Sequence, residues 1–245
     1  MEYSVEVINL CKSYGNKDAV RGVDFKIKEN EIIGLLGPNG CGKTTTIGML
    51  LGLLKPSKGQ ININGMKIEK NRIEILQKIN FISPYIELPK KLTVRQNLEV
   101  YGRLYGIKYL KDRIEEISED LDIKNFFSRK TGELSSGQKN RVSLAKSLIN
   151  KPEILFLDEP TASLDPDIGD FVRTYIQKYR SKNQVTVLLA SHNMNEVERL
   201  CDSIIMMKNG EIIDRGTCEE IIKKHGRNNL EETFLKLARG KNESR

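Results

Sequence analysis

A short segment near residue 40 combines glycines, a lysine and a threonine at a spacing that suits phosphate binding. Residues 37–44 read Gly-Pro-Asn-Gly-Cys-Gly-Lys-Thr and follow the apolar run at 32–36. Glycines let successive backbone N–H groups turn toward one anion, and the start of a helix adds a positive partial charge. Lys43 can reach the outer phosphates of a nucleotide, and Thr44 can ligate magnesium. We name residues 37–44 the phosphate loop and expect these residues to bind nucleotide: Gly37, Pro38, Asn39, Gly40, Cys41, Gly42, Lys43, Thr44 and Thr45.

Two adjacent acids follow a second apolar run. Asp158 and Glu159 come directly after Ile-Leu-Phe-Leu at 154–157, which is typical of a buried parallel strand. Ligands gather at the carboxyl edge of such strands. An aspartate there can hold magnesium through its water shell, and the adjacent glutamate can polarise an attacking water. Together with the phosphate loop, this pair predicts a nucleotide triphosphatase.

The elements that must position these groups follow an α/β pattern. Alternating segments at 5–8 and 23–27 predict exposed strands, and apolar runs at 32–36, 154–157 and 185–189 predict buried strands separated by helical patterns. Residues from about 92 to 150 lose strand character and read as several helices. A last helix is indicated by helical spacing of Leu230, Phe234, Leu237 and Ala238. We therefore predict a phosphate-loop nucleotide hydrolase core with a mostly parallel sheet, an amino-terminal antiparallel β portion and an inserted helical lobe.

Length and composition favour a water-soluble, folded chain. The 245 residues include 38% hydrophobic and 30% charged residues, which suits one domain with a subsidiary lobe. The longest strongly apolar stretch, at 46–54, is too short to cross a bilayer, and the amino terminus does not resemble a signal peptide. The formal charge of +7 is spread among 33 acids, which favours a solvated basic surface over a nucleic-acid stripe.

The four cysteines show no paired metal-ligand spacing. Cys11, Cys41, Cys201 and Cys218 are expected to be free thiols of a cytosolic protein. Cys41, inside the phosphate loop, is either a tolerated small residue or a redox-sensing thiol.

A third motif narrows the class of triphosphatase. Residues 133–141 read Glu-Leu-Ser-Ser-Gly-Gln-Lys-Asn-Arg, which closely resembles the signature sequence of ATP-binding cassette (ABC) proteins. Ser135 or Ser136 would also cap the amphipathic helix that follows. The resemblance implies that Ser135, Ser136, Gly137 and Gln138, here named the signature segment, contact the outer phosphate of ATP held by an opposite subunit. It thus implies a dimer of two cassettes, formed with itself or with a relative.

The resemblance extends along nearly the whole chain and implies further roles. Tyr14 stands where the family has an aromatic that stacks on adenine, although plain packing is an alternative for this ring. Asp165, in Ser163-Leu-Asp165, matches a loop that crosses the dimer interface. His192 stands where the family places a switch histidine that contacts the outer phosphate. The residues with catalytic roles are then Glu159, His192 and Lys43, and the magnesium ligands are Thr44 and Asp158.

Two positions depart from the family pattern. Ser136 replaces the commoner glycine of the signature segment, which leaves the class unchanged. The glutamine that normally follows the strand at 79–82 is absent, and Pro84 or Tyr85 stands in its place. Tyr85 either faces a partner protein or reaches the magnesium site through a bridging water.

The predicted protein is an ATP-binding and ATP-hydrolysing subunit of an ABC transporter. It spans 1–245 as one domain, with a nucleotide-binding core at 1–84 and 151–225, a helical lobe at 85–150, and a carboxyl-terminal helix and tail at 226–245. Its partners are integral membrane subunits and a second ABC subunit, without nucleic acid, at the inner face of the cell membrane. Residues 191–202 resemble subunits of exporters for drugs, sodium or cell-surface compounds. An ABC ATPase acting on DNA or ribosomes, or a nucleotide switch with little hydrolysis, is the alternative.

Overall fold

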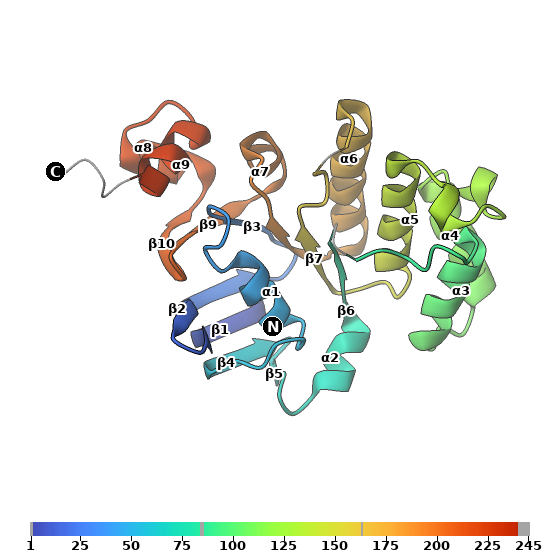
Figure 1. Cartoon of the computed structure of the whole chain (residues 1–245), viewed down its shortest axis with the longest axis horizontal. Coiled ribbons are helices and arrows are strands. Elements are labelled where there is room, and N and C mark those ends of the chain that lie inside the picture. Colours follow the sequence, from blue (N-terminus) through green and yellow to red (C-terminus); the bar gives the residue numbers. More distant parts are fainter. Residues whose placement is uncertain (1, 84–85, 163, 240–245) are drawn as a thin grey trace.

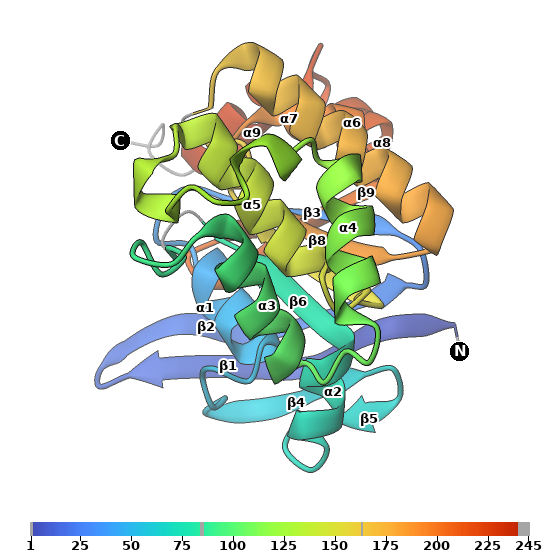
Figure 2. The same cartoon turned by 90° about the vertical axis from the view of Figure 1, so that its right-hand side faces the viewer.

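Two β-sheets and a separate group of helices make up the protein. The computed structural model describes residues 2–83, 86–162 and 164–239. In Figure 1 an antiparallel sheet lies below a larger sheet, the helices α3, α4 and α5 lie at one end, and α8 and α9 lie at the opposite end. Figure 2 looks from the side of α3, α4 and α5, which stand in front of the larger sheet.

The antiparallel sheet is built from the amino-terminal third of the chain. Its order is β2-β1-β4-β5, and its strands are β1 (Tyr3–Tyr14), β2 (Lys17–Lys28), β4 (Lys58–Ile63) and β5 (Met66–Lys67). The sequence pattern predicted much shorter strands at 5–8 and 23–27. The alternation is interrupted because β1 shifts register between Val7 and Leu10, where Asn9 has φ of 45°. Such a bulge keeps the strand paired while it breaks the two-residue period.

The larger sheet carries the ends of the buried strands to one edge. Its order is β10-β9-β3-β8-β7-β6, and its strands are β3 (Ile32–Leu36), β6 (Ile79–Ile82), β7 (Ile154–Asp158), β8 (Thr186–Ala190), β9 (Ser203–Lys208) and β10 (Glu211–Gly216). All neighbours pair in parallel except β9 and β10. The carboxyl ends of β3, β8 and β7 therefore lie side by side.

Helices cover both faces of this sheet. They are α1 (Lys43–Leu50), α2 (Arg72–Lys78), α3 (Val94–Leu104), α4 (Leu110–Asp120), α5 (Ser136–Leu148), α6 (Pro166–Asn183), α7 (Met194–Leu200), α8 (Cys218–His225) and α9 (Leu230–Arg239), with short 3-10 turns at Lys124–Phe126 and Thr131–Glu133. Within the part of the chain described, none of these helices has the length and apolar character needed to cross a membrane.

The alternation of side chains along each strand divides the core into two main clusters. Phe156 of β7 packs with α1 and the antiparallel sheet, whereas its neighbours Leu155 and Leu157 pack with the helices α3 to α6. Leu188 and Leu189 of β8 divide in the same way. Both faces of these strands are buried, which explains why they are continuously apolar in sequence.

The predicted fold class is confirmed: a mostly parallel sheet, an antiparallel portion and an inserted group of helices are all present. The proposed division into 1–84, 85–150, 151–225 and 226–245 stays a prediction. Several predicted features lie outside the described residues. These are Pro84 and Tyr85, the first residue of the Ser163-Leu-Asp165 loop, and the tail from Gly240 onward.

Candidate functional site

The phosphate loop joins the end of β3 to the start of α1, as the sequence predicted. Gly40 and Gly42 have φ of 78° and 111°, values that residues with a Cβ rarely adopt. A Cβ on Gly42 would also lie 2.6 Å from the carbonyl oxygen of Ala19. Gly42 serves as the N-cap of α1 without a side-chain cap. The loop thus turns tightly and leads into a helix start, where backbone N–H groups can receive an anion.

Lys43 is held against this loop. Its Nζ donates to the carbonyl oxygen of Gly37 at 2.6 Å and to that of Pro38 at 3.3 Å, and the residue is 7% exposed. The ammonium group therefore lies beside the loop, within reach of an anion bound to the backbone. Thr44, the next residue, is exposed at the first turn of α1.

The structure favours one of the two interpretations of Cys41. The residue is 3% exposed, and burial raises the pKa of its thiol. A Cβ on Gly37 would lie 2.4 Å from the Cys41 Sγ, so this sulfur fills space inside the loop. Because the thiolate is the reactive form, a raised pKa argues against a redox-sensing role and for simple packing.

Asp158 and Lys43 come together at the carboxyl edge of the larger sheet. Asp158 is the last residue of β7 and is 5% exposed. Burial and the neighbouring Glu159 raise the pKa of its carboxyl, and the charge of Lys43 opposes this rise. A buried carboxylate and the Thr44 hydroxyl are hard oxygen donors of the kind magnesium prefers. Among the described residues, no group of three or more His, Cys, Asp or Glu gathers as a separate metal site.

Glu159 has an unusual backbone conformation that aims its side chain. Its φ is 51°, in the left-handed region, where non-glycine residues are uncommon. Its N–H donates to the carbonyl oxygen of Ala190 at 2.8 Å, which holds the residue against the end of β8. Its Oε1 lies 2.7 Å from the Nδ1 of His192. The side chain of Glu159 is 16% exposed and that of His192 is 66% exposed, so His192 faces solvent and Glu159 is largely covered at this edge of the sheet.

The signature segment forms the capped start of α5. Ser135, not Ser136, is the N-cap: its Oγ accepts from the N–H of Gln138 at 3.3 Å, and the Gln138 side chain accepts from the N–H of Ser135 at 3.1 Å. A Cβ on Gly137 would lie 2.1 Å from Ile168 of α6. Gln138 and Gly137 therefore have structural roles in capping and close packing, and Ser135 and Ser136 are exposed at the start of α5.

Two of the other residues that the sequence predicted for the site, Asp165 and Tyr14, form no hydrogen bond or ion pair with Glu159 or Lys43 within the described part of the chain. Within one chain, α5 stands in the group of helices at one end, away from α1 and the phosphate loop (Figure 1). Asp165 is exposed and is the N-cap of α6, yet its side chain makes no cap hydrogen bond. Tyr14, at the end of β1, is 49% exposed, with the Lys12 Nζ 5.0 Å from its ring centre. An exposed ring suits stacking better than it suits core packing.

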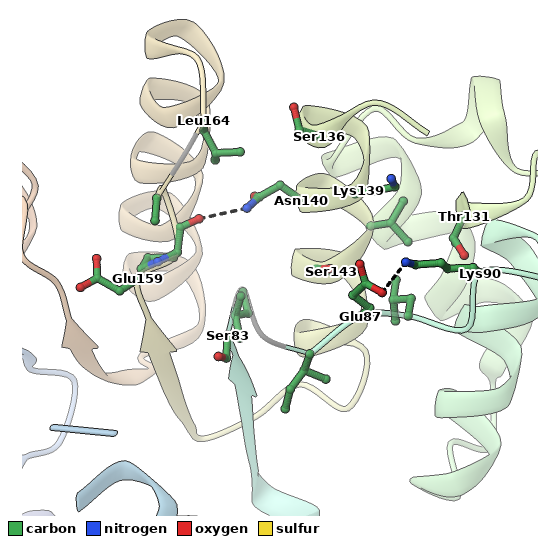
Figure 3. Close-up of a pocket in the computed structure, with 16 residues that line it drawn as sticks. Ser83, Glu87, Lys90, Thr131, Ser136, Lys139, Asn140, Ser143, Glu159 and Leu164 are labelled. Atoms are coloured by element: carbon green, nitrogen blue, oxygen red, sulfur yellow. Dashed lines mark hydrogen bonds and ion pairs between the residues drawn. The ribbon is translucent and has the colours of Figure 1, made fainter. Parts of the chain in front are cut away.

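A pocket of about 250 Å³ separates α5 from the loop that follows Glu159. Figure 3 shows Asn140 reaching across from α5 toward that loop, and its Nδ2 donates to the carbonyl oxygen of Pro160 at 3.0 Å. On the far side, Glu87 and Lys90 form an ion pair at 2.7 Å. The hydrogen bond from Asn140 therefore links α5 to the segment that follows Glu159.

Sequence reasoning missed three residues beside Glu159 and His192. The carboxylate of Glu196 accepts from the Thr161 Oγ1 and from the Ser191 Oγ, each at 2.6 Å. Asn193 followed by Glu196 has the spacing of a capping box, a pattern that would assign Glu196 to local helix capping. In the structure Asn193 does accept from the N–H of Glu196 at 3.2 Å, but the Glu196 carboxylate turns to the two hydroxyls instead.

Proteins of similar sequence are ATP-binding subunits of ABC transporters. The family model described as "ABC transporter" matches residues 20–162. The ABC transporter ATP-binding protein NatA of Bacillus subtilis (strain 168) is 38% identical over 91% of this chain and 92% of its own length. The Nod factor export ATP-binding protein I of Burkholderia orbicola (strain AU 1054) is 36% identical over 89% of this chain and 72% of its own length.

Solved structures extend the likeness to three dimensions. The ATP-binding subunit of an ABC transporter superposes with a TM-score of 0.88 at 26% identity, over 96% of this chain and 99% of that one. A dimeric ATP-binding cassette in a post-hydrolysis state, bound to ADP and Pi, superposes with a TM-score of 0.79 at 28% identity, over 87% of this chain and 98% of that one. The chain therefore belongs to the ABC transporter family, as one of its ATP-binding subunits.

Proposed function

We propose that this chain hydrolyses ATP, with magnesium as cofactor, to drive an exporter-type ABC transporter. The observation that carries the proposal is the contact between the Glu159 Oε1 and the His192 Nδ1, 2.7 Å apart, at the edge where the phosphate loop begins. A carboxylate oriented by a second polar group and adjacent to a phosphate cradle is suited to general-base chemistry.

Each residue then has a distinct part in the reaction. The phosphate loop and Lys43 bind the phosphates of ATP and balance their charge. Glu159 accepts a proton as water attacks the outer phosphorus, the bond from that phosphorus to the bridging oxygen breaks, and ADP and phosphate leave. His192 orients Glu159 and contacts the outer phosphate, and Tyr14 stacks on adenine. Magnesium, held by Thr44 and through water by Asp158, would neutralise the developing charge on the phosphates.

The active assembly in this proposal is a dimer of cassettes. The signature segment, with Ser135 and Ser136 exposed, lies away from the phosphate loop of its own chain, which favours a site completed by another subunit. The start of α5 is suited to an anion because helix N-terminal N–H groups carry positive partial charge. Ser135 and Ser136 would meet the outer phosphate across the interface, and Asp165 would lie at that interface. The dimeric cassette found with ADP and Pi among similar structures supports this arrangement.

Membrane-spanning subunits and export belong to the same proposal. The relatives are named as transporter subunits, and one is named for Nod factor export. Membership of the family favours partners that are integral membrane proteins and a location at the inner face of the membrane, where such subunits would hold this chain.

Mixing two inactive variants tests the composite site. In a homodimer, Ser135→Arg introduces a bulky side chain at the interface, and Lys43→Ala removes a charge from the phosphate loop, so each variant alone should lose turnover. Co-assembled, they leave one site with an intact loop and an intact signature segment. Phosphate release should then reappear in the mixture, whereas mixing separately purified batches of the same variant should give none.

Two outcomes would count against the proposal. Full activity of Ser135→Arg alone would show that the signature segment does not complete a partner's site. ATPase stimulation by DNA or ribosomes, with no integral membrane protein co-purifying from cells, would favour the non-transport alternative.

A further inference from the structure

Glu196 is a buried acid with no assigned role. The residue is 1% exposed and lies in the first turn of α7. Removing a carboxylate from water is costly unless hydrogen bonds replace the lost solvation. Here the Thr161 Oγ1 donates to one oxygen and the Ser191 Oγ donates to the other, each at 2.6 Å. The acid is therefore kept in place by two short hydrogen bonds to hydroxyl groups.

The two hydroxyl groups belong to different loops. Thr161 lies two residues after Glu159, and Ser191 directly precedes His192. Glu159 and His192 themselves are in contact through the Oε1 and Nδ1 atoms, 2.7 Å apart. The buried Glu196 thus links, through its two hydrogen bonds, the segment that carries Glu159 and the segment that carries His192.

Local helix capping does not account for this arrangement. An acid at this position of a capping box would accept from the N–H of the N-cap residue. The Asn193 N–H instead donates to the Ser191 Oγ at 3.1 Å. The Ser191 hydroxyl is therefore fixed by two hydrogen bonds, one donated and one accepted, and the Glu196 carboxylate is used for a tertiary contact.

The segment that follows Glu159 is also hydrogen-bonded to α5. Asn140 of α5 donates to the carbonyl oxygen of Pro160 at 3.0 Å, as Figure 3 shows. Pro160 and Thr161 are consecutive, so the segment after Glu159 is fixed on one side by α5 and on the other by α7. Glu159 has a strained φ that its neighbours must maintain. A displacement of Thr161, two residues further along the chain, would therefore move Glu159 relative to His192.

We propose that Glu196 is a positioning residue for ATP hydrolysis, which holds Glu159 in register with His192 through Thr161 and Ser191. The inference rests on the proposed catalytic role of Glu159. Its consequence is a split in kinetics. Loss of the Glu196 contacts should lower kcat, because a small displacement of a catalytic group is costly, and should leave the KM for ATP unchanged, because the phosphate loop is not part of this network.

The test uses the full chain and five variants. Thr161→Val removes one hydroxyl with little change in shape, and Glu196→Ala removes the acid. Each should lower kcat by about tenfold. The double variant should be no slower than Glu196→Ala, because the contact that Thr161→Val removes is already absent without the acid. Thr161→Ser restores the hydroxyl and should recover most of the parental kcat. Thr233→Val is the matched control, because the buried Thr233 of α9 donates its hydroxyl to the carbonyl oxygen of Asn229, which directly precedes that helix and lies outside the Glu196 network.

The outcomes separate this inference from the proposed function. Parental kcat in Thr161→Val and Glu196→Ala, alongside a Glu159→Gln variant that has lost turnover, would overturn the positioning role alone. Parental turnover in Glu159→Gln would overturn the proposed catalytic residue itself. If Glu196→Ala does not fold, Ser191→Ala replaces it, and an unchanged kcat in both hydroxyl variants overturns the inference.

Discussion

The phosphate loop and the Glu159–His192 corner reach the same edge of the sheet by different means. The phosphate loop is one continuous segment, and its shape is set by glycines with positive φ, Gly40 and Gly42. The Glu159–His192 corner joins residues 33 positions apart in sequence. Parallel pairing of β7 with β8 sets Asp158 opposite Ala190 and brings the two loops together.

This difference predicts how each region fails. In a local motif, one side chain or one glycine decides whether a ligand binds. In an assembled corner, several hydrogen bonds share the task of orientation, so that single changes slow the reaction while binding persists. This expected difference would be contradicted by a variant of the corner that abolishes ATP binding, or by a variant of the phosphate loop that alters turnover alone.

The largest effect on ATP binding is expected from Lys43→Ala. Removing a charge-assisted contact costs about 1.5–3 kcal/mol, so ATP affinity should fall about 10- to 100-fold. Equilibrium titration with a fluorescent ATP analogue measures this, with Lys111→Ala on the exposed face of α4 as the control. An unchanged affinity would remove Lys43 from the nucleotide site.

The glycines of the loop should differ from each other in their effect on stability. Gly42→Ala introduces a backbone strain of about 1–2 kcal/mol and also a clash with the Ala19 carbonyl, 2.6 Å from the new Cβ. Gly40→Ala meets no atom within 4 Å and introduces only the strain. Urea unfolding without nucleotide should therefore rank Gly42→Ala as the less stable variant. Equal stabilities would mean that the close approach to Ala19 does not shape the loop.

The two histidines provide a direct comparison, because His192 lies in the corner and His225 lies in α8. His192→Ala should slow turnover by about tenfold, because Glu159 loses an orienting contact, with little change in unfolding free energy. His225→Ala removes a contact of 2.5 Å to the buried Asp214 and should lower stability by about 1 kcal/mol without slowing turnover. Phosphate release and urea unfolding are measured on both variants. Slower turnover in His225→Ala but not in His192→Ala would contradict the catalytic role of His192.

The sequence predicted the local motif better than the assembled corner. Strand, loop and helix around residues 32–50 fall where the apolar run and glycines indicated. Asp158 and Glu159 were found because acids directly follow a buried strand. The Glu196 network was not found, because its spacing from Asn193 imitates a helix cap and its partners, Thr161 and Ser191, come from two other segments. Bulges explain the other difference, since the register shift near Asn9 hides the true length of β1.

The smallest effect concerns Lys146, which joins α5 to the core. Burial lowers the pKa of its ammonium group to about 8, and its Nζ lies 5.0 Å from the ring centre of Phe81 and 5.3 Å from that of Tyr101. The unfolded chain binds the proton more tightly than the folded chain, so stability should rise with pH as the folded group deprotonates above pH 8.

Lys146→Met is the variant that isolates this effect. The rings stabilise the charged form and reduce the gain, so the parent should gain about 1 kcal/mol relative to Lys146→Met between pH 7 and pH 9.5. Urea unfolding of both proteins at the two pH values measures the difference. A difference that stays constant would show that Lys146 does not titrate in this range.

Glu159→Gln tests the central claim most directly, since the amide keeps the shape of the side chain and cannot accept the proton of water. Phosphate release and ATP affinity are measured on the same preparation, with Glu211→Gln at the exposed start of β10 as the control. We expect ATP affinity to remain, a dimer to accumulate with ATP, and turnover to fall about 10²- to 10⁴-fold. Phosphate release at the parental rate would contradict the assignment of Glu159 as the base for ATP hydrolysis.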